Sequence, residues 1–438
     1  MGNLNRNDPI IIVGAGAFGL STALHLSQAG YTNITVFEQD SQIPPRQSAA
    51  NDLNKIVRAE YEDPFYTDLT IKAINAWQTP LFAPYFHRTG FLHCVSGAAP
   101  AKAVATLDRF RAAAEASPTI APYVDDIPSA AAIRHHVWQY SGAALPGWRG
   151  YLNRFDGYAH SGAALRGIHA AASARGVRFH LGARVAEVAH AAGAGGSPQR
   201  AVGIRTRDGT LHRAAVVVVA CGAGAAGLVP AAGAQVVARA WSVAHVELAP
   251  GEASALRGLP VTYARDLGFF FEPDPASRLL KLCPMGGGYV NTHPATGVSH
   301  APALEESGFM PREDERKVRE LLRQTLPQLA ERPLVRKSLC WFADTSDSDF
   351  VIDYVPGTGG SVVLLSGDSG HGFKMFPIFG QWVRDLLEAR DGTQAVARWR
   401  WKEPKEEVKG GDWGGDVSWR IGETREFSEV RPASESKL

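Results

Sequence analysis

The segment of residues 10–38 limits the possible folds more than any other part of the chain. Its apolar run Ile10–Val13 predicts a buried strand, residues 20–28 predict a helix, and residues 34–37 predict a second strand. Three glycines at the G-x-G-x-x-G spacing join the first strand to the helix, and an acidic residue follows the second strand. This order of elements is typical of a βαβ unit in a nucleotide-binding sheet.

Each residue of this motif has a physical task. Gly14 permits the tight turn, Gly16 lets the backbone approach a pyrophosphate, and Gly19 lets the helix pack closely on the strand. The start of the helix offers unpaired N–H groups and a positive dipole end to phosphates. The Glu38 carboxylate can accept both ribose hydroxyls, and its charge disfavours a 2′-phosphate. A glycine turn with a purely structural role is the alternative, but the complete order of elements favours a dinucleotide site.

The composition excludes several kinds of partner. With 438 residues the chain is long for one core, so we expect two domains. Its 45 basic and 44 acidic residues nearly cancel, which leaves no electrostatic basis for binding nucleic acid or a membrane surface. No apolar run approaches the roughly 20 residues that a membrane-spanning helix needs. The 4 cysteines form no CxxC pair, so we expect neither disulfides nor a metal site.

The last three residues, Ser436, Lys437 and Leu438, match the peroxisomal targeting signal SKL. They end a polar stretch that would be accessible to a receptor. We therefore expect a peroxisomal location and recognition by the peroxisomal import receptor. Peroxisomes contain oxidases that produce hydrogen peroxide, so this location would suit an oxidase.

Two further strand–glycine patterns occur later in the chain. Residues 214–220 predict an apolar strand that leads into the glycine turn 221–224, which resembles the second glycine motif of flavin enzymes. A buried strand and turn without a cofactor role is the alternative for that segment. Residues 362–365 predict another strand, followed by a glycine loop at 367–374 and an apolar helix at 378–387. Pieces of a nucleotide domain are therefore expected at the start, middle and end of the chain.

Several ordered motifs together resemble the fungal flavin-dependent amine oxidases. That family includes monomeric sarcosine oxidase, pipecolate and saccharopine oxidases, and fructosyl amino acid oxidases. The resemblance extends over nearly the whole chain, and several motifs in one order are far more specific than any single one. The motifs are GAGAFG near the start, SAANDLNKIVRAEY (48–61), RDLGFFFEP (265–273), LLKLC (279–283), SLCWFADTSDSDFVID (338–353) and SGDSGHGFKMFP (366–377).

This resemblance implies an α/β fold with two domains and a monomeric protein. One domain is a Rossmann-like FAD-binding domain of the glutathione reductase or D-amino acid oxidase type, assembled from separated segments. The other is a substrate domain with a mixed or antiparallel sheet, consistent with the alternating polarity of residues 241–300. The expected FAD-binding segments are 1–80, 151–235 and 326–400, the substrate-domain segments are 81–150 and 236–325, and a tail with the peroxisomal signal follows at 401–438.

The resemblance also implies a covalent cofactor. Cys340 stands where this family attaches the flavin 8α-methyl group through a thioether, giving 8α-S-cysteinyl FAD. A small buried residue without this role is the alternative, as for most free cysteines. A second cysteine of many fructosyl oxidases is replaced by Phe342. The expected cofactor contacts are Gly14, Gly16, Ala17, Phe18, Gly19, Glu38, Gln39, Ser48, Asn54, Lys55, Val185, Gly222, Cys340, Asp368, Gly370, His371, Gly372, Phe373 and Lys374.

Three cations are the expected catalytic residues. The resemblance implies that Lys281 lies near flavin N5, where its charge favours electron transfer to oxygen, because the first product of that transfer is an anion. It implies that Lys374 and Arg58 bind the substrate carboxylate, for which an arginine fork is well suited. Solvent-facing cations without a catalytic role are the alternative for all three. Together the last two favour an α-amino acid over a simple amine.

The implied reaction is oxidation of a C–N bond. The uncharged amine of a secondary or N-substituted α-amino acid gives a hydride to flavin N5, the imine hydrolyses or cyclises, and oxygen forms hydrogen peroxide. Fructosyl oxidases usually carry an acidic residue four positions after the oxygen-activating lysine, and here that position is Met285. A thioether cannot replace carboxylate hydrogen bonds, so a less polar substituent or a ring is expected rather than a sugar.

Four alternatives stay open at this point. The protein could be a deglycating fructosyl amino acid oxidase, since the wording NDLNK at 51–55 follows that branch. It could oxidise an amine of secondary metabolism whose imine cyclises. It could be a flavin dehydrogenase that passes electrons to another acceptor, which the peroxisomal signal and Lys281 disfavour. It could bind a nucleotide without catalysis, which would leave the three cations and the cysteine without a purpose.

Overall fold

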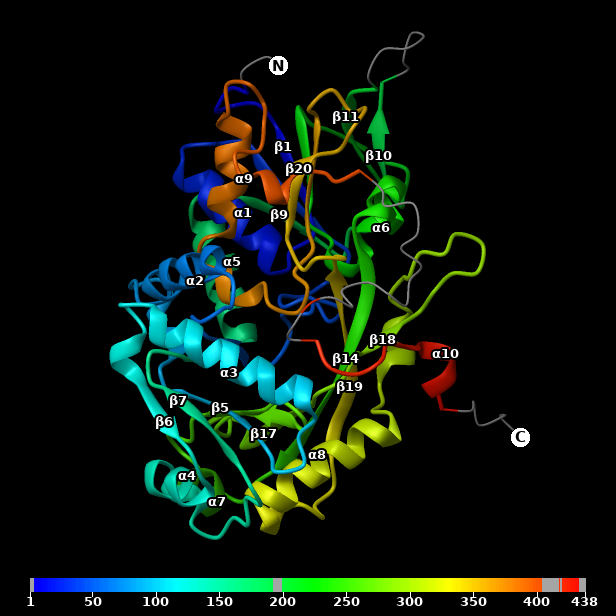
Figure 1. Ribbon diagram of the computed structural model, residues 1–438. Helices are drawn as coiled ribbons and strands as arrows, with labels where there is room; N and C mark the ends of the chain where they lie inside the picture. The colour runs from blue at the N-terminus through cyan, green and yellow to red at the C-terminus, as the bar shows by residue number, and fades with distance from the viewer. Residues whose placement is uncertain (1–3, 192–198, 404–416, 418–419, 433–438) are drawn as a thin grey trace, which may run out of the picture.

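The computed structural model describes residues 4–191, 199–403, 417 and 420–432 of the chain, so the predicted targeting signal Ser436–Leu438 lies outside the described residues. The molecule has two halves, each built around one large sheet (Figure 1). A six-stranded sheet occupies the upper half of that view and a ten-stranded sheet the lower half. No helix within the described residues is both long and apolar enough to cross a membrane.

The six-stranded sheet assembles the predicted pieces of the nucleotide domain. Its order is β20-β21-β13-β1-β2-β9, and every neighbouring pair is parallel except β20 with β21. The expected α/β fold with a Rossmann-like domain is thereby confirmed. The strands are β1 (Ile10–Val13), β2 (Ile34–Glu38), β9 (Arg178–Leu181), β13 (Val216–Val219), β20 (Val351–Tyr354) and β21 (Val362–Ser366).

Helices cover this sheet because their apolar residues meet its valines and isoleucines. α1 (Ala17–Gln28) packs between α5 (Ser161–Ala174) and α9 (Phe379–Glu388), and α2 (Pro64–Trp77) contributes Trp77 to the same core. α2 begins where the sequence provides a cap: Asp63 Oδ1 accepts a hydrogen bond from the Phe65 amide at 3.0 Å.

The first glycine turn is fixed by close approach of backbone to backbone. Gly14 has φ +105°, and a Cβ there would lie 2.5 Å from the Ala220 carbonyl oxygen on the neighbouring strand. A Cβ on Gly19 would lie 1.8 Å from the Gly14 carbonyl oxygen, so α1 could not pack at its present distance. Both positions therefore need glycine for geometric reasons.

The ten-stranded sheet forms the second domain, and its pairing is mixed, as expected. β5 pairs with β15 in parallel, whereas β14 pairs antiparallel with β17, β18 and β19. The strands are β5 (Phe91–Val95), β6 (Val124–Ile127), β7 (Arg149–Asn153), β14 (Val237–Glu247), β15 (Val261–Ala264), β16 (Gly268–Phe270), β17 (Leu279–Pro284), β18 (Tyr289–Val290), β19 (Val335–Asp344) and β22 (Arg425–Glu426).

Helices and two small sheets complete the molecule. α3 and α8 flank the ten-stranded sheet (Figure 1). The remaining elements are α3 (Ala101–Ala116), α4 (Ala130–His136), α6 (Ala225–Leu228), α7 (Pro250–Ala255), α8 (Arg312–Thr325), α10 (Phe427–Val430), the strands β3 (Lys55–Val57), β4 (Phe86–His87) and β8 (Gly157–Ala159) of one small sheet, and β10 (Val185–His190), β11 (Ala201–Thr206) and β12 (Leu211–Arg213) of the other.

The last expected segments, 326–400 and 401–438, divide differently in the structure. β19 pairs with β14 over most of its length and therefore belongs to the substrate-domain sheet, although its residues fall in the expected FAD-binding segment 326–400. Part of the expected tail adds β22 to the same sheet. The physical reason is that β14 is long enough to pair with three strands, one of which is β19. Which strand a segment pairs with cannot be predicted from the residues of that segment alone.

Candidate active site

A cavity of about 1820 Å³ lies between the two sheets. Its wall includes the glycine turn after β1, the loop 45–53, the inner face of β14, β17 and β19, and the glycine loop at 367–374. The cavity connects the carboxyl ends of the parallel strands with the second domain. That is the place where ligands bind in open α/β sheets.

One end of the cavity suits a nucleotide. Gly16 lies at the N-terminus of α1, where no side chain caps the helix within the described residues, so amides of the first turn are available to phosphates. Glu38 is buried, and its two oxygens accept hydrogen bonds from the amides of Ala15 at 2.8 Å and Asp40 at 2.9 Å. Burial raises the pKa of Glu38 despite these donors. The glycine turn, the start of α1 and Glu38 therefore lie close together. This is the arrangement that the pyrophosphate and ribose of FAD would need.

Most of the predicted cofactor contacts line this cavity. The lining residues among them are Gly14, Gly16, Ala17, Phe18, Glu38, Gln39, Ser48, Lys55, Val185, Gly222, Cys340, Asp368, Gly370, His371, Phe373 and Lys374. Gly19, Asn54 and Gly372 do not line it. Gly19 serves helix packing instead, and Asn54 is fully buried with its carbonyl oxygen accepting from Lys281 Nζ.

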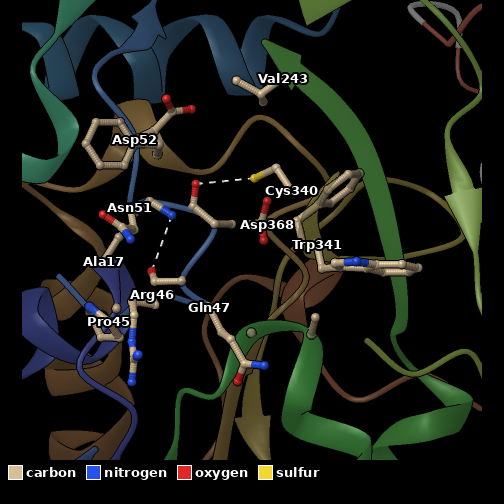
Figure 2. Close-up of a pocket in the computed structure, with 18 of the residues that line it drawn as sticks. Ala17, Pro45, Arg46, Gln47, Asn51, Asp52, Val243, Cys340, Trp341 and Asp368 are labelled. Atoms are coloured by element: carbon tan, nitrogen blue, oxygen red, sulfur yellow. Dashed lines mark hydrogen bonds between the residues drawn. The ribbon is translucent and has the colours of Figure 1, made fainter. Parts of the chain in front are cut away.

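Cys340 lies beside a lysine and a backbone carbonyl. Its Sγ is 3.6 Å from the Ala49 oxygen and 3.9 Å from Lys55 Nζ. Figure 2 shows the thiol directed at the loop of residues 45–52, which it contacts directly. Burial raises the pKa of Cys340, and the charge of Lys55 opposes that shift. The site therefore carries a cation at the position where it would stabilise a thiolate.

Lys281 and Lys55 share one carboxylate. Lys281 Nζ is 2.5 Å and Lys55 Nζ 2.9 Å from the same atom, Asp52 Oδ2. Burial alone would raise the pKa of Asp52, but the two ammonium groups outweigh it and hold that pKa far below its usual range. Burial alone would lower the pKa of Lys55, but Asp52 raises it. Asp52 and Lys55 are therefore both charged at neutral pH.

Lys374 ends a chain of buried hydrogen bonds. Its Nζ donates to the Tyr61 hydroxyl at 2.8 Å and to the His371 carbonyl at 2.9 Å. Tyr61 lies 2.9 Å from His371 Nδ1, and His371 Nε2 lies 2.8 Å from the Ser348 carbonyl. Because a carbonyl only accepts, Nε2 carries the proton and Nδ1 accepts from Tyr61. Burial holds the pKa of His371 well below its usual range, which agrees with a neutral ring.

Arg58 and Lys374 meet at the same end of the cavity. The Arg58 guanidinium lies 4.5 Å from the ring centre of Tyr61 and 4.6 Å from that of Phe110, between the two rings. Burial, followed by the charge of Arg58, holds the pKa of Lys374 well below its usual range. Neither cation forms an ion pair with a carboxylate among the described residues. The arrangement is suited to an anionic ligand group.

The wall between these cations and Lys281 is largely apolar. Tyr263 and Phe269 are stacked with ring centres 5.3 Å apart, and Lys281 Nζ lies 5.1 Å from the ring centre of Phe271. Met285 continues this wall and is buried. The expected catalytic residues Lys281, Lys374 and Arg58 thus line one cavity together with Cys340.

Sequence reasoning missed several residues of the site. Asp52 was visible inside the motif NDLNK, three positions before Lys55, but nothing in the sequence showed that it also reaches Lys281. His245 is buried in the wall opposite Lys281 on β14, and burial lowers its pKa to about 4. No sequence signal marked it as part of the site.

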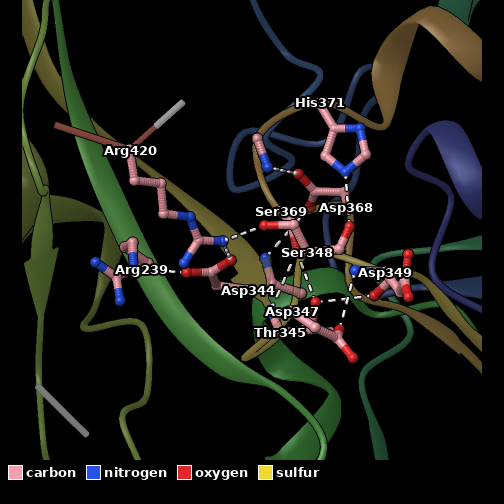
Figure 3. A network of polar contacts seen from close by, with 12 residues as sticks. Arg239, Asp344, Thr345, Asp347, Ser348, Asp349, Asp368, Ser369, His371 and Arg420 are labelled. Carbon is pink, nitrogen blue, oxygen red and sulfur yellow. Dashed lines mark hydrogen bonds and ion pairs between the residues drawn. The ribbon is translucent and has the colours of Figure 1, made fainter. Parts of the chain in front are cut away.

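Arg420 is the third missed residue, and it comes from the C-terminal segment. It is buried, lines the cavity, and pairs with Asp344, which also binds Arg239 at 2.7 Å. Figure 3 shows this triad beside Ser348 and Ser369. Arg420 donates to Ser348 Oγ at 2.8 Å, so the C-terminal segment is anchored next to the glycine loop. Because Arg420 is far from Asp344 in the sequence, only the folded structure shows that it belongs to the site.

Known proteins share this organisation. The family model described as FAD dependent oxidoreductase matches residues 9–386. The L-saccharopine oxidase of Schizosaccharomyces pombe is 29% identical over 434 residues, which cover 94% of this chain and 95% of that protein. The amino acid oxidase imqH of Aspergillus flavus is 28% identical and covers 88% of this chain and 94% of its own length.

Solved structures give the same result. The deglycating fructosamine oxidase of Aspergillus fumigatus (Amadoriase II) is 30% identical and superposes with a TM-score of 0.85 over 98% of this chain and 97% of that one. The fructosyl peptide oxidase from E. terrenum is 28% identical, with a TM-score of 0.85 over 99% of both chains. With a family model matched along most of its length, and with a cavity whose residues fit FAD, the chain belongs to the FAD dependent oxidoreductase family.

Proposed function

We propose that the protein is an oxidase of a secondary or N-substituted α-amino acid, which it converts to an imine with release of hydrogen peroxide. The observation that supports this proposal most strongly is that Arg58 and Lys374 lie together at one end of a cavity that also contains Lys281 and Cys340. FAD, when bound, supplies the two-electron chemistry that takes a hydride from the carbon next to nitrogen and passes the electrons to oxygen. The residues of the chain bind and orient the substrate and provide the positive charges of the site.

Substrate binding is proposed to begin with the carboxylate. The Arg58 guanidinium packs against the rings of Tyr61 and Phe110, which orient its planar group for a carboxylate. Lys374 is held by its hydrogen bond to the Tyr61 hydroxyl. An anion at this point favours the ammonium form of Lys374, whose pKa the buried surroundings otherwise depress. Binding therefore takes up a proton, and we infer that affinity for the carboxylate decreases as the pH rises.

The other part of the substrate contacts the apolar wall. Tyr263, Phe269, Phe271 and Met285 favour an apolar chain or ring over a sugar. Relatives named L-saccharopine oxidase and N-methyl-L-tryptophan oxidase support an N-substituted amino acid. The similarity to fructosamine oxidase structures supports the second candidate, a deglycating oxidase. An amino acid oxidase whose imine cyclises is the third.

A covalent link to FAD at Cys340 is proposed from the thiol's position beside Lys55. The Cys340 thiol would lose its proton, and its sulfur would bond to the 8α-methyl carbon in place of one hydrogen. The electron pair released in that exchange would pass to oxygen. Lys55 supplies the positive charge that favours the thiolate.

A peroxisomal location is proposed from Ser436-Lys437-Leu438, with the import receptor as partner. We expect a fluorescent fusion that ends in these residues to appear in peroxisomes. The same fusion without them should stay in the cytosol, and equal distributions would contradict the proposal.

The proposed activity is tested by anaerobic bleaching of the flavin. We expect secondary and N-substituted α-amino acids to bleach it faster than the matching amines without a carboxylate, because only the former engage Arg58 and Lys374. Admission of oxygen should restore the colour with one peroxide formed per turnover. Faster bleaching by fructosyl amino acids would favour the deglycating alternative, and recolouring without peroxide would indicate a dehydrogenase.

The covalent link is tested by Cys340→Ser. Acid-precipitated wild type should stay yellow and show the added mass of FAD, whereas the variant should release its FAD, because a hydroxyl is a far weaker nucleophile than a thiolate. Cys283→Ser is the matched control, since that thiol also lines the cavity, with burial raising its pKa to about 12. Retention of FAD by the Cys340 variant would exclude the link.

The carboxylate site is tested by Lys374→Met. We expect the KM of N-substituted amino acids to rise by about 10- to 100-fold, the value of one charge-assisted hydrogen bond, and the KM of plain amines to change less. In the wild type, the Kd of a carboxylate ligand that has no amine should increase with pH, because the proton taken up at Lys374 becomes harder to supply. The variant should lose that pH dependence, and an unchanged profile would contradict the assignment.

A further inference from the structure

We propose that Asp52 is a positioning residue that holds Lys281 and Lys55 in the cavity wall as one fixed, singly charged unit. This inference rests on the proposed function only in assigning the oxygen step to Lys281. It concerns a carboxylate that would contact neither the substrate nor oxygen, and that would act through the two lysines it binds.

The geometry gives Asp52 Oδ2 a bridging position. It accepts from Lys281 Nζ at 2.5 Å, on β17, and from Lys55 Nζ at 2.9 Å, on β3. Lys281 Nζ also donates to the Asn54 carbonyl at 2.8 Å, and Lys55 Nζ reaches Cys340 Sγ at 3.9 Å. One carboxylate thus connects the cation assigned to oxygen with the cation beside the thiol.

The loop that carries Asp52 is held by its backbone. The Asp52 carbonyl oxygen accepts from Ser161 Oγ at 2.9 Å and from the Gly162 amide at 3.0 Å. Apart from its bonds to the two lysines, the Asp52 side chain holds the loop only through Oδ1, which accepts a hydrogen bond from the Leu53 amide at 2.8 Å. An amide in place of the carboxylate should keep this loop and remove the charge.

Charge balance explains why a carboxylate is required. Both ammonium groups bind the same carboxylate atom, in a wall where their side chains have little access to water. Two like charges about 5 Å apart repel each other by the equivalent of about two pH units at an effective dielectric constant near 20. The carboxylate offsets this repulsion, and its charge raises the pKa of Lys55 against the effect of burial.

Other titratable groups facing this unit are few. His245 faces Lys281 from β14, and burial keeps that ring neutral with a pKa of about 4. Cys283 from β17 and Cys340 from β19 face it as thiols whose pKa burial raises. Asp368 of the glycine loop also acts on Lys55, and burial raises the pKa of that carboxyl to about 6. It forms no ion pair with either lysine among the described residues, so it does not replace the two direct contacts of Asp52.

The test is Asp52→Asn in the holoenzyme. The flavin is reduced with dithionite, so no substrate is needed, and its reoxidation by oxygen is followed from pH 6 to 10. We expect the variant's reoxidation rate to fall with rising pH about two units earlier than the wild-type rate, with roughly a tenfold loss one pH unit above the variant's own midpoint. The fraction of chains carrying covalent FAD, read from intact mass, should also decrease.

A second substitution separates charge from structure. Adding Lys55→Met to Asp52→Asn removes the repelling cation, so the pH profile of reoxidation should return toward that of the wild type. Asp349→Asn is the control, because Asp349 is another buried carboxylate paired with a cation, Arg398, and it does not line the cavity. Its reoxidation profile should match that of the wild type.

Three outcomes would overturn the inference. One is a wild-type pH profile in Asp52→Asn, which would show that the carboxylate does not set the charge of the lysines. Another is a uniform loss at every pH that Lys55→Met does not correct, which would show a structural role only. The third is an Asp349→Asn profile shifted as far as that of Asp52→Asn. Because reduction is chemical, failure to find an amino acid substrate would affect the proposed function and leave this test unchanged.

Discussion

The register of β14 against β17 and β19 determines the chemistry of the cavity. It sets Lys281 opposite His245 and Cys340 opposite Trp241, and on β17 the residues Lys281 and Cys283 face the cavity while Leu280 and Leu282 face the core. A shift of one residue in β17 would turn Leu280 and Leu282 toward the cavity and bury the lysine in the core of the second domain. The pairing of apolar residues on the far face therefore fixes which polar groups can act on a ligand.

The cavity treats its cations in two different ways. At one end Asp52 forms ion pairs with Lys281 and Lys55, so a carboxylate of the chain itself balances part of their charge. At the other end Arg58 contacts aromatic faces and Lys374 contacts a hydroxyl and a carbonyl. No carboxylate of the described residues forms an ion pair with either group, although burial, which lowers the pKa of Arg58, is outweighed by the charges of Tyr61 and Glu60. The proposed substrate carboxylate would complete this end and so give the substrate a direction in the cavity.

The sequence was most informative where a local pattern carries a physical requirement. The glycines of residues 14–19 and the acid at the end of β2 could be assigned tasks because turn geometry and hydrogen bonding leave few alternatives. The mixed sheet of the second domain was also predictable from alternating polarity. Family motifs then placed Lys281, Lys374 and Arg58 correctly in one cavity.

Contacts between distant segments were beyond such reasoning. The membership of β19 in the second sheet depends on β14, almost a hundred residues earlier in the chain. Asp52 could be noticed as a neighbour of Lys55, but its bond to Lys281 joins a loop to a strand more than 200 residues later, which no sequence periodicity connects. A Cβ on Gly287 would lie 2.3 Å from the Glu423 carbonyl oxygen, so packing of the C-terminal segment requires a glycine that no local pattern marks.

The Arg420–Asp344 contact has a consequence for biogenesis. The strand with Cys340 leaves the ribosome well before the segment that contributes Arg420 to the wall. During synthesis Cys340 therefore emerges while one side of the cavity is still missing and Asp344 lacks one of its partners. The wall around the cavity is complete only after translation has supplied the segment with Arg420.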